Sequence, residues 1–529
     1  MIRIKALTLP YKHSHDAIEK LIVSKLKISR DNITAVNIIR KSIDARRKNQ
    51  IKFVYTIDIS LSGIDEKELK LPQNAELLSD KANLYIMPKS AAEKKKTVIA
   101  GSGPAGLLAG LMLARLGYKP IIIERGKAVE DRIKDVYDFW KTGKLDPESN
   151  VQFGEGGAGT FSDGKLASQV KDKANRSRKV LSELIAAGAP EEIMYHARPH
   201  IGTDNLIKVV RNIRKEIISL GGEVLFESRL TSIKTKADRI TGITINENTE
   251  IDTDNLILAI GHSARDTFEM LHESGVAMEA KPFSIGVRIE HKQGIINKSQ
   301  YNTYETDPIL GAADYKLVHH CPNGRSAYTF CMCPGGEVIA SSSEAGMVAT
   351  NGMSHYKRSL PNANSALLVG VTPADFASDS PLAGIEFQRK WERQAFVTGG
   401  SNYAAPVQLV GDFLASKAST CVAGVLPTYK PGFLSCDLAE TLPDFVAQTL
   451  KLALPQLDKK LKGFASPGAV MTAIETRSSC PLRILRDETF QNPAIRGLYP
   501  AGEGAGYAGG IMSAAIDGIK IAEAIINCQ

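Results

Sequence analysis

The stretch Thr97-Val-Ile-Ala-Gly-Ser-Gly-Pro-Ala-Gly-Leu-Leu-Ala-Gly110 decides the fold of this chain. Its apolar start predicts a short strand, and the pattern Gly101-x-Gly103-x-x-Gly106 predicts a tight turn into a helix that reaches about Leu116. In such a turn the first glycine permits the reversal of the chain. The second lets the backbone approach a pyrophosphate, and the third lets helix and strand touch. The helix N-terminus presents free N–H groups and the positive end of its dipole to the phosphates.

A second strand with an acidic end strengthens this prediction. The run Ile121-Ile-Ile-Glu-Arg-Gly126 reaches Glu124, which lies 23 positions after Gly101. At that spacing a carboxylate can accept hydrogen bonds from both hydroxyls of an adenosine ribose. A glycine-rich turn with no ligand is the alternative, but it would leave Glu124 without a role. We therefore predict a dinucleotide site formed by Gly101, Ser102, Gly103, Pro104, Ala105, Gly106, Glu124 and Arg125.

A second glycine-rich segment follows at residues 150–165, with the sequence Asn-Val-Gln-Phe-Gly-Glu-Gly-Gly-Ala-Gly-Thr-Phe-Ser-Asp-Gly-Lys. Such a loop can pass close to a planar ligand while hydroxyl and ammonium groups meet ligand oxygens. The alternative is a flexible loop that binds nothing. We interpret the segment as part of the same site, with contributions from Gly157, Gly159, Thr160, Ser162 and Lys165.

Length and composition are those of an ordinary globular chain. The 529 residues fit about three domains, and 43% apolar with 23% charged residues is usual for soluble proteins. The sequence has no apolar run long enough to span a membrane and no apolar signal-peptide core at its start. Seven scattered cysteines do not make a disulfide framework. These features predict a cytoplasmic protein.

The excess positive charge lies before the dinucleotide motif. Residues 1–95 hold 19 Lys and Arg against 11 Asp and Glu, which accounts for the whole net charge of +8. Apolar spacing there predicts a strand at 2–8, a helix at 16–26 and strands at 33–43 and 50–60, the order of a small α+β domain. Basic residues gather near the hairpin tip: Arg40, Lys41, Arg46, Arg47 and Lys48. They indicate either a polyanion-binding edge or a solvated hairpin whose charges protect a strand edge, and we favour the second.

The later chain continues the α/β pattern, leaves it and returns to it. We predict an amphipathic helix from Leu206 to Ile218, capped by Thr203 or Asp204, and a buried strand at 255–260 that ends in Gly261. Between about 281 and 463, strand-like pieces alternate with Pro- and Gly-rich connections, which indicates an inserted domain. A strand and glycine turn at 496–503 and a helix from the 504–511 turn to about 526 restore the first pattern.

Four segments together resemble the glutathione-reductase-type FAD proteins, in which a substrate domain interrupts the FAD domain: 101–106, 124–126, 258–261 and 501–503. Residues 156–166, 330–336 and 475–481 look like the bacterial FAD-utilising dehydrogenase family, which carries a small N-terminal domain. The resemblance implies an α/β fold with a split, Rossmann-like FAD-binding domain, an inserted α+β substrate domain and a small N-terminal α+β (ferredoxin-like) domain. The implied boundaries are 1–90 for the N-terminal domain, 95–280 and 464–529 for the FAD domain, and 281–463 for the substrate domain.

The resemblance also implies roles for individual residues. The Gly101–Gly106 turn would bind the pyrophosphate of FAD, Glu124 its adenosine ribose, and Leu230 would lie beside the adenine. The wider superfamily usually ends its last motif with Asp, where this chain has Glu503, which is one methylene longer. The turn before Ile511 would point a helix N-terminus at the flavin and favour its anionic reduced form. The implied contacts from the later chain are Leu230, Gly261, Gly502, Glu503, Gly509, Gly510 and Ile511.

Candidates for the chemistry are few, because FAD itself would carry the redox step. Cys331 and Cys333 would share a strand face, which fits a flavin-linked dithiol, a metal half-site or two ordinary core cysteines, and we favour the last. Arg477 and Arg288 fit either an anion clamp or structural ion pairs. His262 follows the apolar strand and could be an acid/base or a partner of the backbone. The catalytic candidates are therefore Cys331, Cys333, His262 and Arg477, and we expect no metal site.

We therefore expect an FAD-dependent oxidoreductase with non-covalent FAD and a small-molecule substrate. NAD(P)H is a second expected partner without a motif of its own, since no further GxGxxG follows a strand. Two alternatives stay open. One is an NAD(P)-dependent dehydrogenase with its single nucleotide site at Gly101, and the other is an RNA- or tRNA-associated flavoprotein that uses the basic N-terminal domain. The substrate, the electron donor and acceptor, and the oligomeric state do not follow from the sequence.

Overall fold

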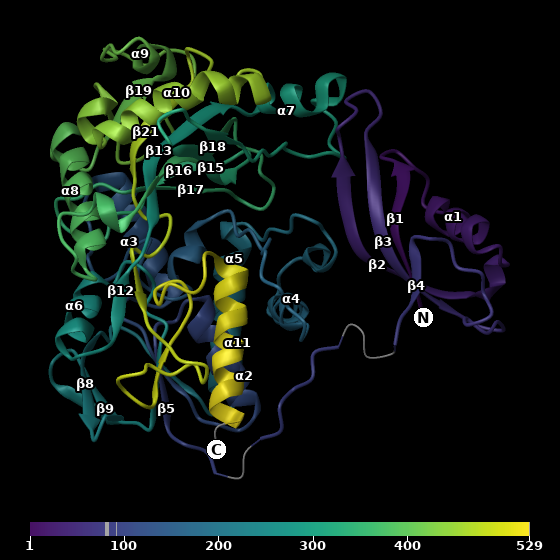
Figure 1. Ribbon diagram of the computed structural model, residues 1–529, viewed down its shortest axis with the longest axis horizontal. Helices are drawn as coiled ribbons and strands as arrows, with labels where there is room; N and C mark the ends of the chain where they lie inside the picture. The colour runs from purple at the N-terminus through teal and green to yellow at the C-terminus, as the bar shows by residue number, and fades with distance from the viewer. Residues whose placement is uncertain (80–83, 91–92, 528–529) are drawn as a thin grey trace.

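A computed structural model of the chain describes residues 1–79, 84–90 and 93–527. The N-terminal sheet and its helix stand beside the rest of the molecule, at the right of Figure 1. The strand order is β2-β3-β1-β4, and β1 is antiparallel to both neighbours. The elements are β1 (Ile2–Pro10), α1 (Ala17–Leu26), β2 (Ile33–Asp44), β3 (Lys52–Leu61) and β4 (Ala75–Leu77). The predicted strands and helix of this region are confirmed to within two residues.

The ferredoxin-like expectation holds for the strand order but not for the second helix. Residues 62–74, between β3 and β4, form turns and bends where that fold has its second crossover helix. This connection contains Gly63 and Pro72, which disfavour a helix, and its apolar residues Ile64, Leu69 and Leu71 pack against the core of the sheet.

The outer edge of β2 contacts the following domain. The Lys41 N–H donates to the Tyr195 carbonyl at 2.7 Å, and the Ala197 N–H donates to the Lys41 carbonyl at 2.9 Å. A second contact between the two domains comes just after β1, where the Tyr11 hydroxyl donates to the Asp307 carboxylate at 2.9 Å. Part of the strand edge that carries the basic residues is therefore paired, not exposed as the solvated-hairpin interpretation assumed. The sequence also predicts a linker between domains at residues 91–96, of which 91–92 lie outside the described residues.

A five-stranded sheet in the order β23-β11-β5-β6-β7 forms the centre of the half of the molecule that carries the Gly101 turn, and every adjacent pair in it is parallel. We call it the nucleotide sheet, after the predicted site. The strands are β5 (Thr97–Ala100), β6 (Ile121–Ile123), β7 (Glu223–Leu225), β11 (Asn255–Leu258) and β23 (Leu498–Pro500). Because β23 pairs with β11 and β11 with β5, the end of the chain completes a sheet that the first motif begins. The predicted discontinuous sheet is confirmed.

Helices cover one face of this sheet, and a small antiparallel sheet covers the other. On the first face pack α2 (Pro104–Arg115), α5 (Thr203–Ser219), α4 (Arg176–Ala186) and α11 (Ile511–Asn527), with α11 beside α2 (Figure 1). On the second face lie β8 (Leu230–Lys236), β9 (Arg239–Ile245), β10 (Thr249–Asp252) and α6 (Arg265–Glu273). A methyl group at Gly106 would overlap the Gly101 carbonyl oxygen, so the third glycine of the motif does allow helix and turn to touch.

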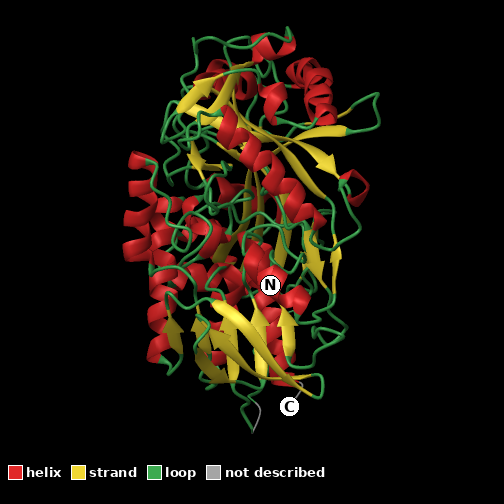
Figure 2. Cartoon of the chain, turned by 90° about the vertical axis from the view of Figure 1, so that its left-hand side faces the viewer, coloured by secondary structure: helices red, strands yellow, loops and turns green. Residues whose placement is uncertain are grey.

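A seven-stranded sheet forms the second half, in the order β14-β15-β18-β13-β21-β19-β20. In the side view of Figure 2 the strands gather in an upper and a lower group, which correspond to the two halves. The strands of the seven-stranded sheet are β13 (Phe283–Lys292), β14 (Val318–His320), β15 (Ser326–Cys333), β18 (Asn362–Val371), β19 (Ala405–Leu409), β20 (Phe433–Ser435) and β21 (Val470–Glu475). Further elements of this half are α7 (Gln293–Tyr301), β16 (Glu337–Ala340), β17 (Thr350–Met353), α8 (Ala383–Thr398), α9 (Val410–Leu414) and α10 (Asp444–Lys460).

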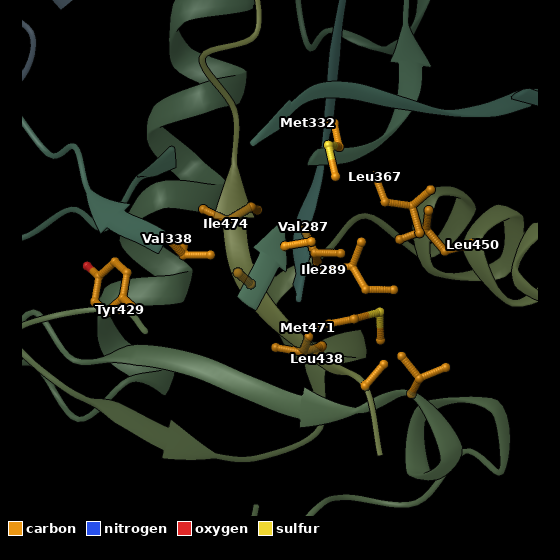
Figure 3. Close-up of a cluster of buried hydrophobic side chains, with 14 of the residues drawn as sticks. Val287, Ile289, Met332, Val338, Leu367, Tyr429, Leu438, Leu450, Met471 and Ile474 are labelled. Carbon is orange, nitrogen blue, oxygen red and sulfur yellow. The ribbon is translucent and has the colours of Figure 1, made fainter. Parts of the chain in front are cut away.

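The largest apolar core lies around this sheet. Figure 3 shows Val287, Ile289 and Met471 of the sheet together with Leu450 of α10. The helix α3 (Val129–Thr142), which follows the nucleotide motif in sequence, packs into the same core through Phe139 and Trp140. The Trp140 indole N–H donates to the Ala340 carbonyl at 2.9 Å, which joins the two halves of the molecule.

The chain returns to the nucleotide sheet later than residue 464, where we placed the second part of the FAD domain. Strand β21 pairs with β13 and β19 in the seven-stranded sheet, so the return comes after Glu475. The two-stranded sheet of β12 (Met278–Ala280) and β22 (Leu482–Ile484) then links the outgoing and returning chain. The apolar run of β21 predicts a buried strand but carries no signal of which sheet it joins.

The predicted cap of α5 is wrong. The residue before the helix is Gly202, and neither following side chain caps it. The Thr203 hydroxyl donates to the Thr160 carbonyl at 2.8 Å, and the Asp204 carboxylate accepts from the Tyr356 N–H at 2.8 Å. Both side chains are therefore used to hold neighbouring segments, which a local sequence pattern does not reveal.

Candidate functional site

A cavity of about 870 Å³ lies at the carboxyl ends of β5, β11 and β23. Ligands of open parallel sheets bind at this edge, and the volume falls in the upper part of the range of about 300–1,000 Å³ for small-molecule sites. The Gly101–Ala105 turn and the Tyr507–Ala514 segment line the same cavity. The seven-stranded sheet contributes Phe330, Cys331 and Glu475 to the opposite wall. The site therefore lies between the two halves of the molecule.

Most residues predicted to contact the cofactor line this cavity. They are Gly101, Gly103, Pro104, Ala105, Glu124, Arg125, Gly157, Gly159, Ser162, Lys165, Leu230, Gly261, Glu503, Gly509, Gly510 and Ile511. Among the catalytic candidates, Cys331, His262 and Arg477 also line it. Ser102, Gly106, Thr160, Gly502 and Cys333 do not line it. The Thr160 hydroxyl donates to the Glu155 carbonyl at 3.2 Å.

Several lining glycines leave space that a side chain would fill. No atom lies within 4 Å of a Cβ built on Gly261, Gly509 or Gly510, and on Gly103 the nearest is the Gly157 Cα at 3.9 Å. Gly101, by contrast, is required by its surroundings, since its φ is +104° and a methyl group would overlap the Ala259 carbonyl. The glycines thus serve two purposes: some allow the chain to turn, and others keep the cavity open.

The Glu124 carboxylate is buried and already accepts four hydrogen bonds. One oxygen accepts from the Ser102 N–H at 2.9 Å and the Ser102 hydroxyl at 2.7 Å. The other accepts from the Gly126 N–H at 3.0 Å and the Gly154 N–H at 2.9 Å. Because a carboxylate offers about four lone-pair positions, a ribose hydroxyl would bind here only if the Ser102 hydroxyl turned away. Glu124 also ties the two glycine-rich segments together.

Arginine side chains surround this end of the cavity. Arg125 forms ion pairs with Glu148 at 2.9 Å and Asp266 at 2.8 Å, and its guanidinium lies 4.0 Å from the centre of the Phe153 ring. Arg229, which sequence reasoning missed, contacts the same two carboxylates. In the sequence, only the position of Arg229 next to Leu230 indicated that it could lie at the site.

Lys165 lies in a buried charge network on the far side of the loop. Its ammonium is 3.4 Å from the Asp163 carboxylate and donates to the Met332 carbonyl. Asp163 is buried and also accepts from Arg358 at 2.9 Å. Burial opposes ionisation of Asp163, but Lys165 and Arg358 outweigh it and hold the pKa of the carboxyl below its usual value. Lys165 therefore carries its charge next to β15.

Glu503 and His262 face each other with shifted pKa values. Burial raises the pKa of Glu503 to about 7, although Lys281 and the Gly510 N–H favour its charged form. Burial and then the nearby Arg477 lower the pKa of His262 to about 3. The two side chains are 4.0 Å apart, and between these pKa values neither is charged. His262 is therefore a weak base near neutral pH, and Glu503 is the group of this pair that can exchange a proton there.

Arg477 and Arg288 both form buried ion pairs, as the structural interpretation expected. Arg477 binds Glu392 through contacts of 2.9 and 3.1 Å and also donates to Ser263 and Ser343. Arg288 binds Glu475 at 3.1 Å. Both arginines are thus held in buried ion pairs, which is the structural interpretation of the sequence.

Cys331 and Cys333 do not lie on a regular strand. The pairing of β15 with β18 shifts between Phe330 and Cys333, and Cys331 has a φ of +42°. Only Cys331 of the pair lines the cavity. Their predicted common strand face is therefore replaced by a bulge. Among the described residues no group of three or more His, Cys, Asp and Glu could hold a metal ion, so the metal half-site finds no partner there.

The cavity fits a dinucleotide cofactor of the FAD type. It is lined by the N-terminal residues of α2 and of α11, and both helix N-termini suit anionic groups. The open glycines Gly103, Gly261 and Gly509 also line it, and a planar ligand can approach the backbone there. Within the described part of the chain no helix is long and apolar enough to cross a membrane.

Comparison with known proteins identifies the family. A protein of Clostridium beijerinckii, described only as uncharacterized, is 49% identical over 534 residues, which cover 99% of this chain and 98% of that protein. The family "FAD-dependent protein, C-terminal domain-like" matches residues 282–478. This chain belongs to that family of FAD-dependent proteins. A second family model, described as a domain of unknown function, matches residues 1–60 of the chain.

Solved flavoproteins show weaker likeness. A flavin-dependent brominase is 14% identical, with a TM-score of 0.36 over 82% of this chain and 80% of that chain. A geranylgeranyl bacteriochlorophyll reductase-like protein of Thermoplasma acidophilum is 11% identical, with a TM-score of 0.34 over 82% and 79%. Glycine oxidase of Bacillus cereus is 10% identical, with a TM-score of 0.30 over 82% and 96%. These scores are too low to align individual site residues.

Proposed function

We propose that this FAD-dependent protein is an oxidoreductase that binds FAD non-covalently and oxidises or reduces a small molecule between its two halves. FAD, when bound, would supply the two-electron redox chemistry. The observation that carries the proposal is a single continuous cavity lined by the first glycine turn and by the start of the last helix. An NAD(P) site at Gly101 alone would leave the segment from Glu503 to Ile511 without a ligand.

Different residues of the cavity would bind different parts of the cofactor. The Gly101–Ala105 turn and the α2 N-terminus would bind the pyrophosphate, and Glu124 with Ser102 would bind the adenosine ribose. The free N–H groups at the start of α11 would face the flavin ring and stabilise negative charge on it. Glu503, uncharged below its pKa of about 7, would hold a proton near the start of α11.

The wall formed by the seven-stranded sheet would receive the substrate. Its strand β15 contributes Phe330 to the cavity, and Lys316 and Asn351 line the cavity from neighbouring segments of the same half. Phe330 is 39% exposed, which is high for an aromatic ring in a folded protein and suits a surface that a ligand covers.

Absorbance of the purified protein tests the proposal. We expect flavin bands, and after denaturation the released cofactor should be FAD by chromatography and mass, at about one per chain. A colourless protein that takes up NAD instead would support the single-site dehydrogenase. Anaerobic reduction with NADH and, separately, NADPH would then identify the electron donor before acceptors are screened.

A nucleic-acid partner is the less supported alternative. Arg46 is paired with Asp44 at 2.6 Å and the Lys41 ammonium lies 4.3 Å from the centre of the Phe53 ring, so two of the five basic residues already have partners. A salt titration of RNA binding by the full chain would test it, because phosphate contacts cause a steep loss of affinity with salt. Weak RNA binding with a flat salt dependence would argue against a nucleic-acid partner for the basic N-terminal domain.

A further inference from the structure

The bulge in β15 turns Cys331 towards the cavity and keeps Cys333 behind it. A bulge re-aims side chains, and a non-glycine residue in the left-handed region concentrates at functional sites because the surrounding structure must hold it there. The φ of +42° at Cys331 and the register shift beside it are such features. The Cys333 thiol donates to the Cys331 carbonyl at 3.4 Å, so the two residues fold back on one another.

Two cations lie against this pair. The Lys165 ammonium donates to the carbonyl of Met332, the residue between the cysteines. Arg288 donates to the Cys331 carbonyl at 2.8 Å and lies 3.8 Å from the Cys333 sulfur. Both cations are fixed by carboxylates, Lys165 by Asp163 and Arg288 by Glu475. Their positions favour one thiolate in the pair.

Cys331 is the cysteine of the pair that reaches the cavity, whereas Cys333 is fully buried. A hydrogen bond from the Cys333 thiol, together with the charges of Lys165 and Arg288, lowers the pKa of Cys331 well below that of an ordinary thiol, although burial opposes this and Asp163 raises it. The same hydrogen bond and burial raise the pKa of Cys333. Glu475 also faces the pair, and burial raises its pKa to about 7. The arrangement is one cysteine at the cavity with a second, buried cysteine directly behind it.

We propose that Cys331 and Cys333 form a redox-active dithiol and that the substrate class is a small disulfide. The Cys331 thiolate attacks one substrate sulfur. A bond forms between enzyme and substrate, the substrate disulfide breaks, and the first substrate thiolate leaves. Cys333 then gives up its proton and attacks the Cys331 sulfur, and the second substrate thiolate leaves. The substrate gains two electrons and the Cys333 proton, and the cysteine pair becomes a disulfide.

A single round of this exchange needs only the two cysteines. Repeated turnover rests on the proposed function, since an oxidoreductase must return two electrons to the pair. The two inferences therefore fail separately. If the protein carries FAD but the cysteines react independently, the dithiol is wrong. If the pair closes in a protein that binds no flavin, the proposed function is wrong.

The test uses 5,5′-dithiobis(2-nitrobenzoate) on the reduced full-length protein with the exposed Cys421 and the C-terminal Cys528 both replaced by Ala. We expect two thionitrobenzoate anions to be released rapidly, a final mass lower by two hydrogens, and a disulfide between 331 and 333 in the peptide map. In Cys333→Ser one anion should be released and one probe group should stay on Cys331. In Cys331→Ser the fast phase should slow by at least about tenfold, because the low-pKa thiolate is lost.

Cys436→Ser is the matched control, because burial raises the pKa of that half-buried thiol to about 12 and it should not contribute to the fast phase. The rate of the fast phase should also stay nearly constant from pH 8 to pH 6, since Cys331 is already ionised there. Retention of probe groups on both cysteines, or an unchanged fast phase in Cys331→Ser, would overturn the proposal.

Discussion

Gly518 of α11 lies directly against the backbone carbonyl of Ala105 in α2, although 413 positions separate the two residues. A methyl group at 518 would overlap the Ala105 oxygen. Ala105 belongs to the first turn of the helix that opens the dinucleotide motif. The last helix of the chain is thus fitted onto the first turn of the nucleotide site, and the cavity exists only when both are in place.

Gly518→Ala should lower the free energy of unfolding by about 1–3 kcal/mol, because the added methyl group overpacks a helix contact that has no room for it. The same change should weaken retention of flavin, because α11 also carries residues that line the cavity. Denaturant unfolding and flavin content after gel filtration measure the two effects. Gly294→Ala in α7 is the control, since no atom lies within 4 Å of its Cβ position. Equal stability of the two variants would contradict the close fit.

Glu392→Gln should cost about 3–5 kcal/mol at pH 7, because it leaves the buried Arg477 with only a neutral partner and the buried Arg265 with Glu344 as its one remaining carboxylate. The charged pair lowers the folded pKa of Glu392, so the stabilisation is present above the unfolded pKa of about 4.3 and is lost as the pH falls through the lower folded value. The difference between the variant and the parent should therefore shrink in unfolding experiments below pH 4. The exposed Glu386→Gln on the same helix should change stability by at most about 0.5 kcal/mol.

Glu503→Gln should change the pH dependence of stability in the flavin-free protein. The pKa of Glu503 in the folded protein is raised to about 7. Its contribution to the free energy of unfolding is therefore present below the unfolded pKa of about 4.3 and is lost as the pH rises through 7. Glutamine cannot ionise, so the stability of the variant should rise relative to that of the parent between pH 5 and pH 8. Melting temperatures across this range measure the effect. Parallel curves for parent and variant would mean that Glu503 titrates normally.

Gly509→Val should lower flavin affinity by at least about tenfold, or about 1.4 kcal/mol, because the side chain would enter the open cavity. Stability without flavin should change by no more than about 0.5 kcal/mol, since nothing lies within 4 Å of the Cβ position. Titration of the flavin-free protein with FAD, followed by fluorescence quenching, gives the affinity. Gly432→Val, also at an open position, should bind FAD like the parent. Unchanged affinity in Gly509→Val would place the ligand elsewhere.

The sequence by itself predicted the elements whose signals are local. The glycine turn at 101–106 with apolar strands on both sides predicts β5, α2 and β6, and the repeat of this pattern near the C-terminus predicts β23 and α11. The β-α-β-β order of the N-terminal domain follows equally from apolar spacing. These signals suffice because turns, helix starts and strand alternation depend on residues within a few positions of one another.

Only the tertiary structure decided how distant side chains combine. It joined β21 to the seven-stranded sheet, paired Arg477 with Glu392, and placed Lys165 and Arg288 beside the bulge at Cys331. Each of these outcomes depends on contacts between residues more than 40 positions apart, and an ion pair or a bulge leaves no periodic pattern in the chain. Most of the residues that the sequence predicted to contact the cofactor thus line the cavity. The charge state of their side chains could not be predicted, because burial and the partner across the cavity set each pKa.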